Sequence, residues 1–337
     1  MNHAVILARR PQAIPQSEHF ALEERPMPVP ADGQIWVRNH YLSVEPAMRG
    51  WLSDASNYSD PIHVGDVMRA FAVGEVVESR HGDFAPGDRV MGLFGWQEHA
   101  AVDPSAILLR VPDTDLPLSL YLGILGLNGV TAYFGLLDIC APRPGETVLV
   151  STAAGSVGSC VGQIAAISGC RTVGLAGGPE KRRQCLDEFG YDAAIDYRGE
   201  PDLDAAIARA CPDGVDIYFD NIAGPISDAV LRHLRLHARI AVCGTASIAS
   251  WDPWPQGARP ERHLLVKRAT MRGFLTFDYA DRFDEAVAQL SAWLREGRLH
   301  YREDILEGLG EAPGAIARLY SGQNQGKLLI RLPAAKD

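Results

Sequence analysis

Apolar and polar residues follow two different patterns along the chain, and the change comes near residue 120. Before that point, short alternating segments at 35–38, 72–77 and 89–93 are separated by turns rich in Pro, Gly and Asp. Turns at such close spacing favour a small β-barrel or sandwich over alternating strands and helices. Residues 123–136 are apolar with small residues at helical spacing, which predicts a buried helix that connects two domains.

Beyond this helix the chain alternates between apolar runs and helical segments. Predicted strands lie at 148–151, 172–176, 193–195, 215–220, 239–243, 270–276 and 327–332. Predicted helices lie at 158–168, 179–189, 202–210, 226–234, 281–296 and 312–321. Strands that alternate with helices imply a parallel, doubly wound sheet. A Pro- and Trp-rich loop at 250–260 interrupts this order, and loops of that length are usually functional or mobile.

The turn after the first of these strands carries small residues in a GxGxxG frame, with Ala153 in the first position, followed by Gly155 and Gly158. Small residues let the chain turn sharply, let a pyrophosphate approach the backbone and let the helix pack closely on the strand. The free N–H groups at the helix N-terminus can then bind the phosphates. Because the flanking strands and helix fit this motif, we expect a dinucleotide site rather than an ordinary strand–helix turn.

The end of the next predicted strand indicates which nicotinamide cofactor binds. A site for NAD places Asp or Glu there to accept a hydrogen bond from the ribose 2′-hydroxyl, whereas this chain has Gly177 and Gly178. Lys181, Arg182 and Arg183 follow, and cations without a carboxylate suit a 2′-phosphate. The alternative is a solvated basic face, but cations oppose the dipole at a helix N-terminus. We therefore expect NADPH rather than NADH.

Composition narrows the possible partners and the compartment. A chain of 337 residues can form two domains, and its net charge of −10 disfavours nucleic acid or an anionic membrane as a partner. The sequence contains no run of about eighteen apolar residues, so we expect no transmembrane helix. The six cysteines include no CxxC pair, so we expect no zinc site. Scattered thiols are typical of a cytoplasmic protein, and the ten histidines form no visible cluster.

Several segments resemble the zinc-free branch of the medium-chain dehydrogenase/reductase superfamily: AAGSVGSCVGQIA, GLAGGPEKRR, YFDNIAG, GTASI and SGQNQGK. Within that branch the chain is most similar to NADPH-dependent double-bond reductases, namely prostaglandin and leukotriene reductases, plant alkenal reductases and bacterial curcumin reductase. The resemblance extends over nearly the whole chain through YLSVEPAMRG, GDVMRAFAVGEVVES, GWQEHA and GILGLNGVTAYFGLLD.

The resemblance implies an α/β protein with a GroES-like β-barrel domain and a Rossmann domain with a doubly wound parallel sheet. The expected boundaries are 1–122 for the GroES-like substrate domain, 123–297 for the Rossmann NADP-binding domain, and 298–337 for a return to the first domain. It further implies NADP(H) as the cofactor, no metal, a small apolar enone as the substrate, and a cytoplasmic homodimer.

The resemblance also implies which residues bind the cofactor. The phosphates and a ribose would be contacted by Gly155, Ser156, Val157, Gly158, Gly178, Lys181, Tyr197 and Asn221, and Asn324 would reach back to the cofactor. The nicotinamide would be lined by residues of 243–249 and 274–276, namely Cys243, Gly244, Thr245, Ala246, Ser247, Phe274, Leu275 and Thr276. Taken alone, Tyr197 and Asn324 could equally be a surface tyrosine and a turn asparagine.

The expected chemistry is reduction of a conjugated carbon–carbon double bond, with hydride added at the β-carbon and a proton at the α-carbon. The developing enolate needs a hydrogen-bond donor, and a donor must supply the proton. Tyr58 matches a tyrosine at the substrate cleft of curcumin-reductase-like relatives, and a phenol with a pKa near 10 is a donor at neutral pH. The alternative is a turn tyrosine that only packs.

One position departs from the family pattern. Relatives usually read DPYMR where this chain has Ala47 in EPAMR, which removes a ring from the expected pocket wall and leaves the substrate open. Candidates for an apolar substrate wall are Trp51, Trp96, Trp251 and Trp254, although Trp96 could equally be a core residue. Alternative functions are an NADPH quinone reductase of the same fold and a non-catalytic NADPH-binding protein. A zinc alcohol dehydrogenase fits less well because the closely spaced thiolates are missing.

Overall fold

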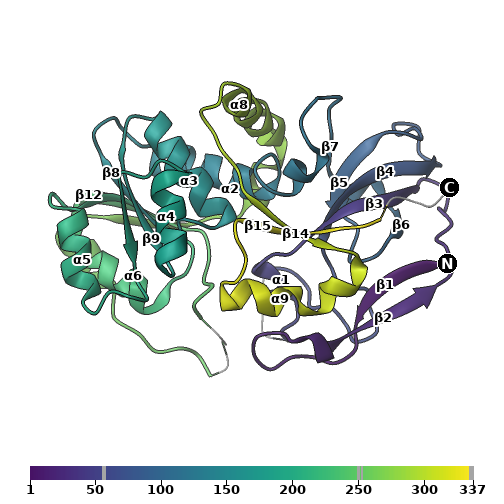
Figure 1. Ribbon diagram of the computed structural model, residues 1–337, viewed down its shortest axis with the longest axis horizontal. Coiled ribbons are helices and arrows are strands. Elements are labelled where there is room, and N and C mark those ends of the chain that lie inside the picture. Colours follow the sequence, from purple (N-terminus) through teal and green to yellow (C-terminus); the bar gives the residue numbers. More distant parts are fainter. Residues whose placement is uncertain (55–57, 249–250, 252, 334–337) are drawn as a thin grey trace. The chain divides into compact units, whose positions relative to one another are not determined.

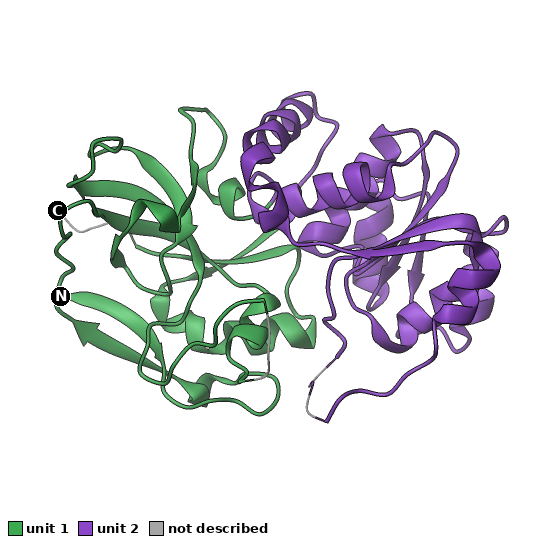
Figure 2. Cartoon of the chain, turned by 180° about the vertical axis from the view of Figure 1, so that it is seen from behind, with its two compact units in different colours: residues 1–123, 303–337 green, residues 124–302 purple. Residues whose placement is uncertain are grey.

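The computed structural model describes residues 1–54, 58–248, 251 and 253–333. Its elements form two compact units, Met1–Gly123 with Glu303–Asp337 and Ile124–Arg302, shown in separate colours in Figure 2. The expected domain boundaries lay at 122/123 and 297/298. No described helix has the length and apolar content needed to cross a membrane.

Unit 1 is built on an antiparallel β-sheet, as the closely spaced turns predict (Figure 1). Its seven-stranded sheet has the order β14-β15-β3-β4-β5-β7, and β6 pairs with β3. All strand pairs of this sheet are antiparallel except β14 with β15. The bounds are β3 Ile35–Ser43, β4 Phe71–Ser79, β5 Arg89–Leu93, β6 His99–Val102, β7 Ile107–Arg110, β14 Glu303–Glu307 and β15 Lys327–Arg331.

The other elements of unit 1 surround this sheet. A separate two-stranded sheet pairs β1 Asn2–Leu7 with β2 Phe20–Arg25. The helices are α1 Ala47–Trp51 and α9 Ala312–Ser321, and 3₁₀ turns lie at Ser17–His19, Pro104–Ala106, Leu118–Leu122 and Leu309–Glu311. The alternation of apolar residues within β3 buries every second side chain in its first half, which is the pattern of a half-buried strand.

Unit 2 contains the expected doubly wound sheet, with helices on both faces (Figure 1). Its six strands are all parallel in the order β10-β9-β8-β11-β12-β13, so the strand order reverses between β8 and β11, which is the topological switch point. The strands are β8 Thr147–Ser151, β9 Arg171–Ala176, β10 Ala193–Asp196, β11 Val215–Asp220, β12 Leu234–Val242 and β13 Thr270–Gly273. The Rossmann fold class is therefore confirmed.

The helices of unit 2 begin and end close to the predicted positions. They are α2 Leu127–Phe134, α3 Ser156–Ile167, α4 Pro179–Asp187, α5 Leu203–Ala210, α6 Gly224–Leu231, α7 Glu261–Lys267 and α8 Phe283–Arg295, with a π-helix at Gly135–Cys140 and a 3₁₀ segment at Thr276–Arg282. Three boundaries differ by three residues or more: α6 ends three residues before 234, β12 begins at Leu234 rather than 239, and β13 ends at Gly273 rather than 276. The loop predicted at 250–260 is followed by α7, which the pattern did not indicate.

The helix predicted at 123–136 begins only at Leu127 and continues as a π-helix to Cys140. Gly123 and Gly126 both have backbone angles outside the helical region, so the helix cannot start earlier. Glycine at 135 is required by packing, because a Cβ there would lie 2.4 Å from the Phe274 ring. The prediction of one continuous helix was therefore wrong at both ends.

Candidate functional site

The glycine-rich turn between β8 and α3 has the geometry that the motif predicts. Gly155 is the N-cap of α3, and its N–H donates to the Thr152 carbonyl at 2.8 Å. A Cβ on Gly158 would lie 2.3 Å from the same carbonyl oxygen, so only glycine permits this close contact of helix and strand. Because a glycine caps the helix, no N-cap side chain covers the N–H groups of Ser156, Val157 and Gly158.

A buried tyrosine that the sequence reasoning missed holds α3 in place. The Tyr191 hydroxyl donates to the Gly158 carbonyl at 2.6 Å, and a Cβ on Gly162 would lie 2.2 Å from the tyrosine ring. Burial raises the pKa of Tyr191 well above its usual value, so the phenol stays a donor. Its position thirty-three residues beyond Gly158 left no local signal in the sequence.

The segment after β9 brings Gly177 and Gly178 beside the end of β10. Asp196, the last residue of β10, pairs in register with Ala176, and its Oδ1 accepts the Gly178 N–H at 2.7 Å. The sequence pattern placed no acid here, because Asp196 is distant along the chain. Gly178 was expected to contact the cofactor, and its N–H donates to Asp196 in this structure. Lys181 lies in the first turn of α4.

The structure also shows the contacts of Tyr197 and of Arg182, one of the three basic residues at 181–183. The Tyr197 hydroxyl lies 2.7 Å from the position of a Cβ on Gly177, and its half-buried ring packs against the hydrophobic core. Arg182 Nε donates to the Ala194 carbonyl of β10 at 2.9 Å, so this cation helps to hold α4 on the edge strand. Tyr197 therefore lies at the expected place, while Arg182 has a structural contact.

The carboxyl ends of β8 and β11 carry a dense polar network around Asn221. Its Nδ2 donates to the Ser151 carbonyl at 2.7 Å, and its backbone N–H donates to the Ser151 hydroxyl at 2.8 Å. Next to it, Asp220 is 4% exposed, and its Oδ1 accepts the N–H groups of Ile222 and Ala223, each at 2.9 Å. Burial raises the pKa of the Asp220 carboxyl. This network holds the side chain of Asn221, the residue that the resemblance places near a ribose.

The loop after β12 is held to the same strand end. Cys243 and Gly244 donate their N–H groups to the Asp220 carbonyl at 2.8 and 3.1 Å, and the Ser247 hydroxyl donates to the Ile222 carbonyl at 2.7 Å. Burial raises the pKa of the Cys243 thiol to about 12, so the thiol stays protonated. Asn221, Cys243, Gly244, Thr245, Ala246 and Ser247 are thus brought together, while Ala249 lies outside the described residues.

The second expected nicotinamide segment follows β13. Phe274 contacts the Phe219 ring edge-on with a centroid distance of 6.3 Å, and Thr276 makes a hydroxyl–hydroxyl contact with Thr131 of α2. Leu275 is 36% exposed. Phe274 is therefore anchored to the β-sheet and to the π-helix that follows α2, which explains why Gly135 cannot carry a side chain.

The remaining expected residues belong to unit 1. Tyr58 is 51% exposed, and Ala47 begins α1 with a half-buried side chain. Asn324 is buried, and its Nδ2 donates to the Gly326 carbonyl at 2.8 Å, which is the contact of a turn asparagine. Trp51 and Trp96 are 4% and 0% exposed and pack in the core against Phe71 and Phe20. Trp96 is therefore a core residue, which is the alternative that the sequence left open, and Trp51 is buried as well.

Unit 1 also buries an ion pair that sequence reasoning missed. Lys327 Nζ lies 2.6 Å from both Glu45 Oε1 and the Ser43 hydroxyl, and it donates to the Val44 carbonyl at 3.2 Å. Burial lowers the pKa of Lys327, and Glu45 counteracts that effect. A charged residue within an apolar strand such as KLLIR could have signalled a buried partner.

The arrangement in unit 2 fits a dinucleotide with a 2′-phosphate. The turn at Gly155–Gly158 leaves backbone donors uncovered, and Tyr197 approaches Gly177, where an NAD site would carry an acid. Among the residues that the structure describes, no group of three or more His, Cys, Asp or Glu side chains is placed to hold a metal ion.

Comparison with known proteins identifies the family. The profile of the N-terminal domain of oxidoreductases matches residues 3–109, and that of zinc-binding dehydrogenases matches residues 156–292. The chain belongs to the zinc-free medium-chain dehydrogenase/reductase family, in its branch of NADPH-dependent double-bond reductases.

Particular relatives cover almost the entire chain. The NADPH-dependent curcumin reductase of Escherichia coli is 42% identical and covers 98% of this chain and 97% of the relative. The NADP-dependent 2-alkenal reductase of Nicotiana tabacum is 41% identical and covers 88% of this chain and 86% of the relative. The crystal structure of CurA from Vibrio vulnificus in complex with NADPH is 40% identical, covers 99% of this chain and 100% of that chain, and has a TM-score of 0.92.

Proposed function

We propose that this protein is an NADPH-dependent reductase of the carbon–carbon double bond of α,β-unsaturated ketones and aldehydes with bulky apolar substituents. The observation that carries the proposal is the pairing of the glycine turn at 155–158 with a glycine at 177 that faces Tyr197. The similarity to curcumin and alkenal reductases over almost the whole chain supports the reaction class.

Residues of unit 2 would hold NADP(H), which supplies the hydride when bound. Backbone donors at the start of α3 would bind the pyrophosphate, and Lys181 with Tyr197 would bind the 2′-phosphate. Asn221 would bind the ribose, because the Ser151 contacts hold its side chain in one orientation. The residues at 243–247 and 274–276 would line the nicotinamide.

Tyr58 of unit 1 would serve as the hydrogen-bond donor for the enolate oxygen or as the proton donor. About half of the residue is exposed, which supports a contact with a substrate. Ala47 is small where relatives carry a tyrosine, which supports a pocket that accepts bulky substrates. The burial of Trp51 and Trp96 leaves Trp251 and Trp254, whose rings lie 4.9 Å apart, as aromatic candidates for the substrate wall.

A panel of enones, alkenals and quinones assayed with NADPH and with NADH tests this function. We expect oxidation of NADPH with the enones, loss of the substrate double bond by mass spectrometry, and a clear preference for NADPH. Lys181→Ala should raise the KM for NADPH and leave the KM for NADH unchanged. Turnover of quinones alone would favour quinone reduction instead. Cofactor binding without turnover of any panel member would favour the non-catalytic alternative.

The chain is further proposed to form a cytoplasmic homodimer. β13 is an edge strand of the parallel sheet with all four residues exposed, and the adjacent α7 exposes Leu265 and Val266 at 78% and 54%. An edge beyond which the described part of the sheet has no further strand, next in sequence to exposed apolar side chains of α7, is suited to pairing with a second copy. Analytical ultracentrifugation of wild type and of Met271→Lys should show a dimer that the substitution dissociates; a wild-type monomer would refute it.

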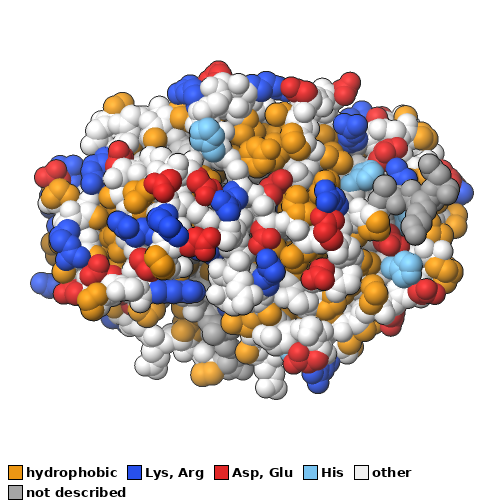
Figure 3. Space-filling view, viewed as in Figure 1, with side chains coloured by type: hydrophobic (Ala, Val, Ile, Leu, Met, Phe, Trp, Pro, Cys, Tyr) orange, Lys and Arg blue, Asp and Glu red, His pale blue; other side chains and the backbone are white. Residues whose placement is uncertain are grey.

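The surface supports a small-molecule substrate rather than a nucleic acid. On the face in Figure 3, acidic and basic side chains are interspersed instead of gathering into a basic patch. The scattered cysteines, all unpaired, support the cytoplasmic assignment.

A further inference from the structure

A turn at the end of β10 places three consecutive side chains around the glycines that follow β9. The N–H groups of Gly199 and Glu200 donate to the Asp196 carbonyl at 3.2 and 3.0 Å, which closes the turn. The N–H groups of Gly178 and Arg198 donate to Asp196 Oδ1 at 2.7 and 3.1 Å. The Asp196 carboxylate therefore ties its own turn to the residue that caps α4.

This turn directs Arg198 over Gly177. A Cβ on Gly177 would lie 3.1 Å from Arg198 Nε and 2.7 Å from the Tyr197 hydroxyl, so both polar groups converge on one backbone position. In the parallel register, Asp196 lies opposite Ala176, which brings the next residues of both strands together. The convergence is thus a product of strand pairing.

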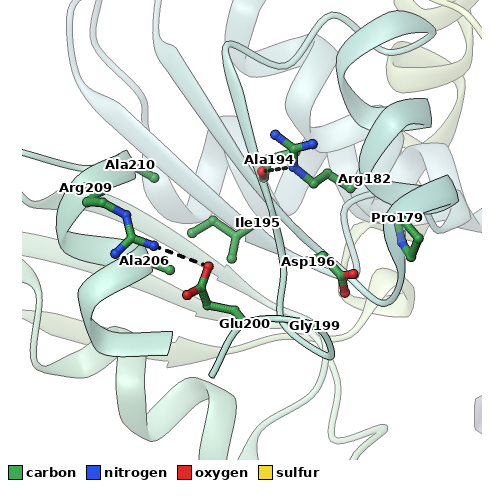
Figure 4. A pocket seen from close by; sticks show the side chains of 10 residues that line it. All are labelled: Pro179, Arg182, Ala194, Ile195, Asp196, Gly199, Glu200, Ala206, Arg209 and Ala210. Atoms are coloured by element: carbon green, nitrogen blue, oxygen red, sulfur yellow. Dashed lines mark hydrogen bonds and ion pairs between the residues drawn. The ribbon is translucent and has the colours of Figure 1, made fainter. Parts of the chain in front are cut away.

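Arg198 differs from its basic neighbours in what compensates its charge. Arg182 donates to the Ala194 carbonyl, and Arg209 pairs with Glu200 at 3.3 Å, as Figure 4 shows beside a pocket of about 550 Å³. Within the described part of the chain, no carboxylate forms an ion pair with the Arg198 guanidinium, and its side chain is exposed. An exposed guanidinium beside a phenol hydroxyl is suited to binding a phosphate.

We propose that Arg198 is a second cationic ligand of the 2′-phosphate of NADP(H), and that Asp196 is the positioning residue that holds it over Gly177. The proposal rests on the proposed function only for the identity of the cofactor. Lys181 lies on α4, whereas Arg198 follows β10. The phosphate would therefore be bound by cations from two elements. Selectivity for NADPH then depends on β10 as well as on α4.

Binding of adenosine 2′,5′-bisphosphate and of 5′-AMP to the full chain, measured by isothermal titration calorimetry, tests the proposal without turnover. Arg198→Gln should weaken binding of the bisphosphate about tenfold, because the substitution removes a charge-assisted hydrogen bond to the phosphate. Binding of 5′-AMP should not change. Arg198→Lys should restore part of the affinity, because it retains the charge but loses the planar fork.

Arg209→Gln is the matched control, since it removes the same charge from the neighbouring α5 and should leave both affinities unchanged. Equal weakening of both ligands by Arg198→Gln, or unchanged binding of the bisphosphate, would overturn the proposal. If the enone panel shows no turnover while Arg198→Gln still weakens the bisphosphate selectively, the proposed reaction fails and this inference stands.

Discussion

Glu45 in unit 1 and Asp220 in unit 2 are both buried acids next to segments expected to function, yet they differ in what compensates the charge. Glu45 pairs with a buried lysine from β15 at 2.6 Å. Asp220 has backbone N–H groups and the Tyr218 hydroxyl as its hydrogen-bond donors. Glu45 Oε1 also accepts a hydrogen bond from the Ser43 hydroxyl, but its charge is compensated by the lysine, whereas the charge of Asp220 is compensated by dipoles of the local backbone.

The position of each acid explains the difference. Glu45 lies between β3 and α1, where its partner comes from a strand distant in the sequence. Asp220 ends β11 directly before a tight turn in which Ala223 and Gly224 have positive φ angles of 58° and 68°. In such a turn successive N–H groups point inward, and one carboxylate can accept several of them.

Removing the lysine should have the largest effect. Lys327→Met leaves Glu45 buried without its cation, and we expect a loss of about 3–5 kcal/mol in the free energy of unfolding. Urea unfolding followed by near-UV circular dichroism measures this loss. The double variant with Glu45→Met should recover most of it, because no uncompensated charge remains.

Arg331→Met is the control for this experiment, since Arg331 lies on the same strand as Lys327 but forms an exposed pair with Glu307 of β14. The unfolding midpoint should barely move, as expected for a solvated ion pair. A double variant no more stable than Lys327→Met would contradict the role assigned to the buried pair.

Asp220→Ala should have the next largest effect. It leaves the N–H groups of Ile222 and Ala223 without their acceptor, at an expected cost of about 2–3 kcal/mol. Asp220→Asn keeps an acceptor oxygen, so its unfolding midpoint should stay close to that of wild type. Thermal unfolding of both variants checks this order. Equal losses for Ala and Asn would show that the charge itself is required.

Asp220 should also make the stability of the protein depend on pH. The folded pKa of Asp220 is raised, so its contribution to stability is fully present below the unfolded pKa, near 3.9, and is lost as pH rises through the folded value. Compared with Asp220→Asn, wild type should therefore gain stability as pH falls from 7 to about 4. Thermal unfolding of both proteins across that range measures the difference, and a constant difference would contradict the raised pKa.

The smallest effect is expected at Asp196, a partly exposed acid that also accepts two N–H groups. Asp196→Asn keeps the acceptor and removes a negative charge close to the proposed phosphate site. Adenosine 2′,5′-bisphosphate should then bind about twofold to threefold more tightly at low salt, with less difference at high salt. Weaker binding would indicate that the turn depends on the carboxylate charge.

Much of unit 2 was predictable because its signals are local. Apolar runs mark the strands, small residues mark the turn at 155–158, and the missing acid at 177–178 indicates the cofactor. Each depends on residues within one turn or one strand. The same local reasoning could not decide between a substrate wall and the core for Trp96, because burial of an aromatic side chain depends on which strands cover it.

By itself, the sequence determined the order of elements, the doubly wound topology and the glycine positions, since these follow from periodicity and backbone sterics along a continuous segment. Only the tertiary structure decided which side chains meet across strands. Lys327 and Glu45 are 282 residues apart. Asp196 and Arg198 reach Gly178 and Gly177 only through the parallel register of β9 and β10. The physical reason is that charges interact through space, and the sequence pattern does not give the spatial distance between residues that are far apart in the chain.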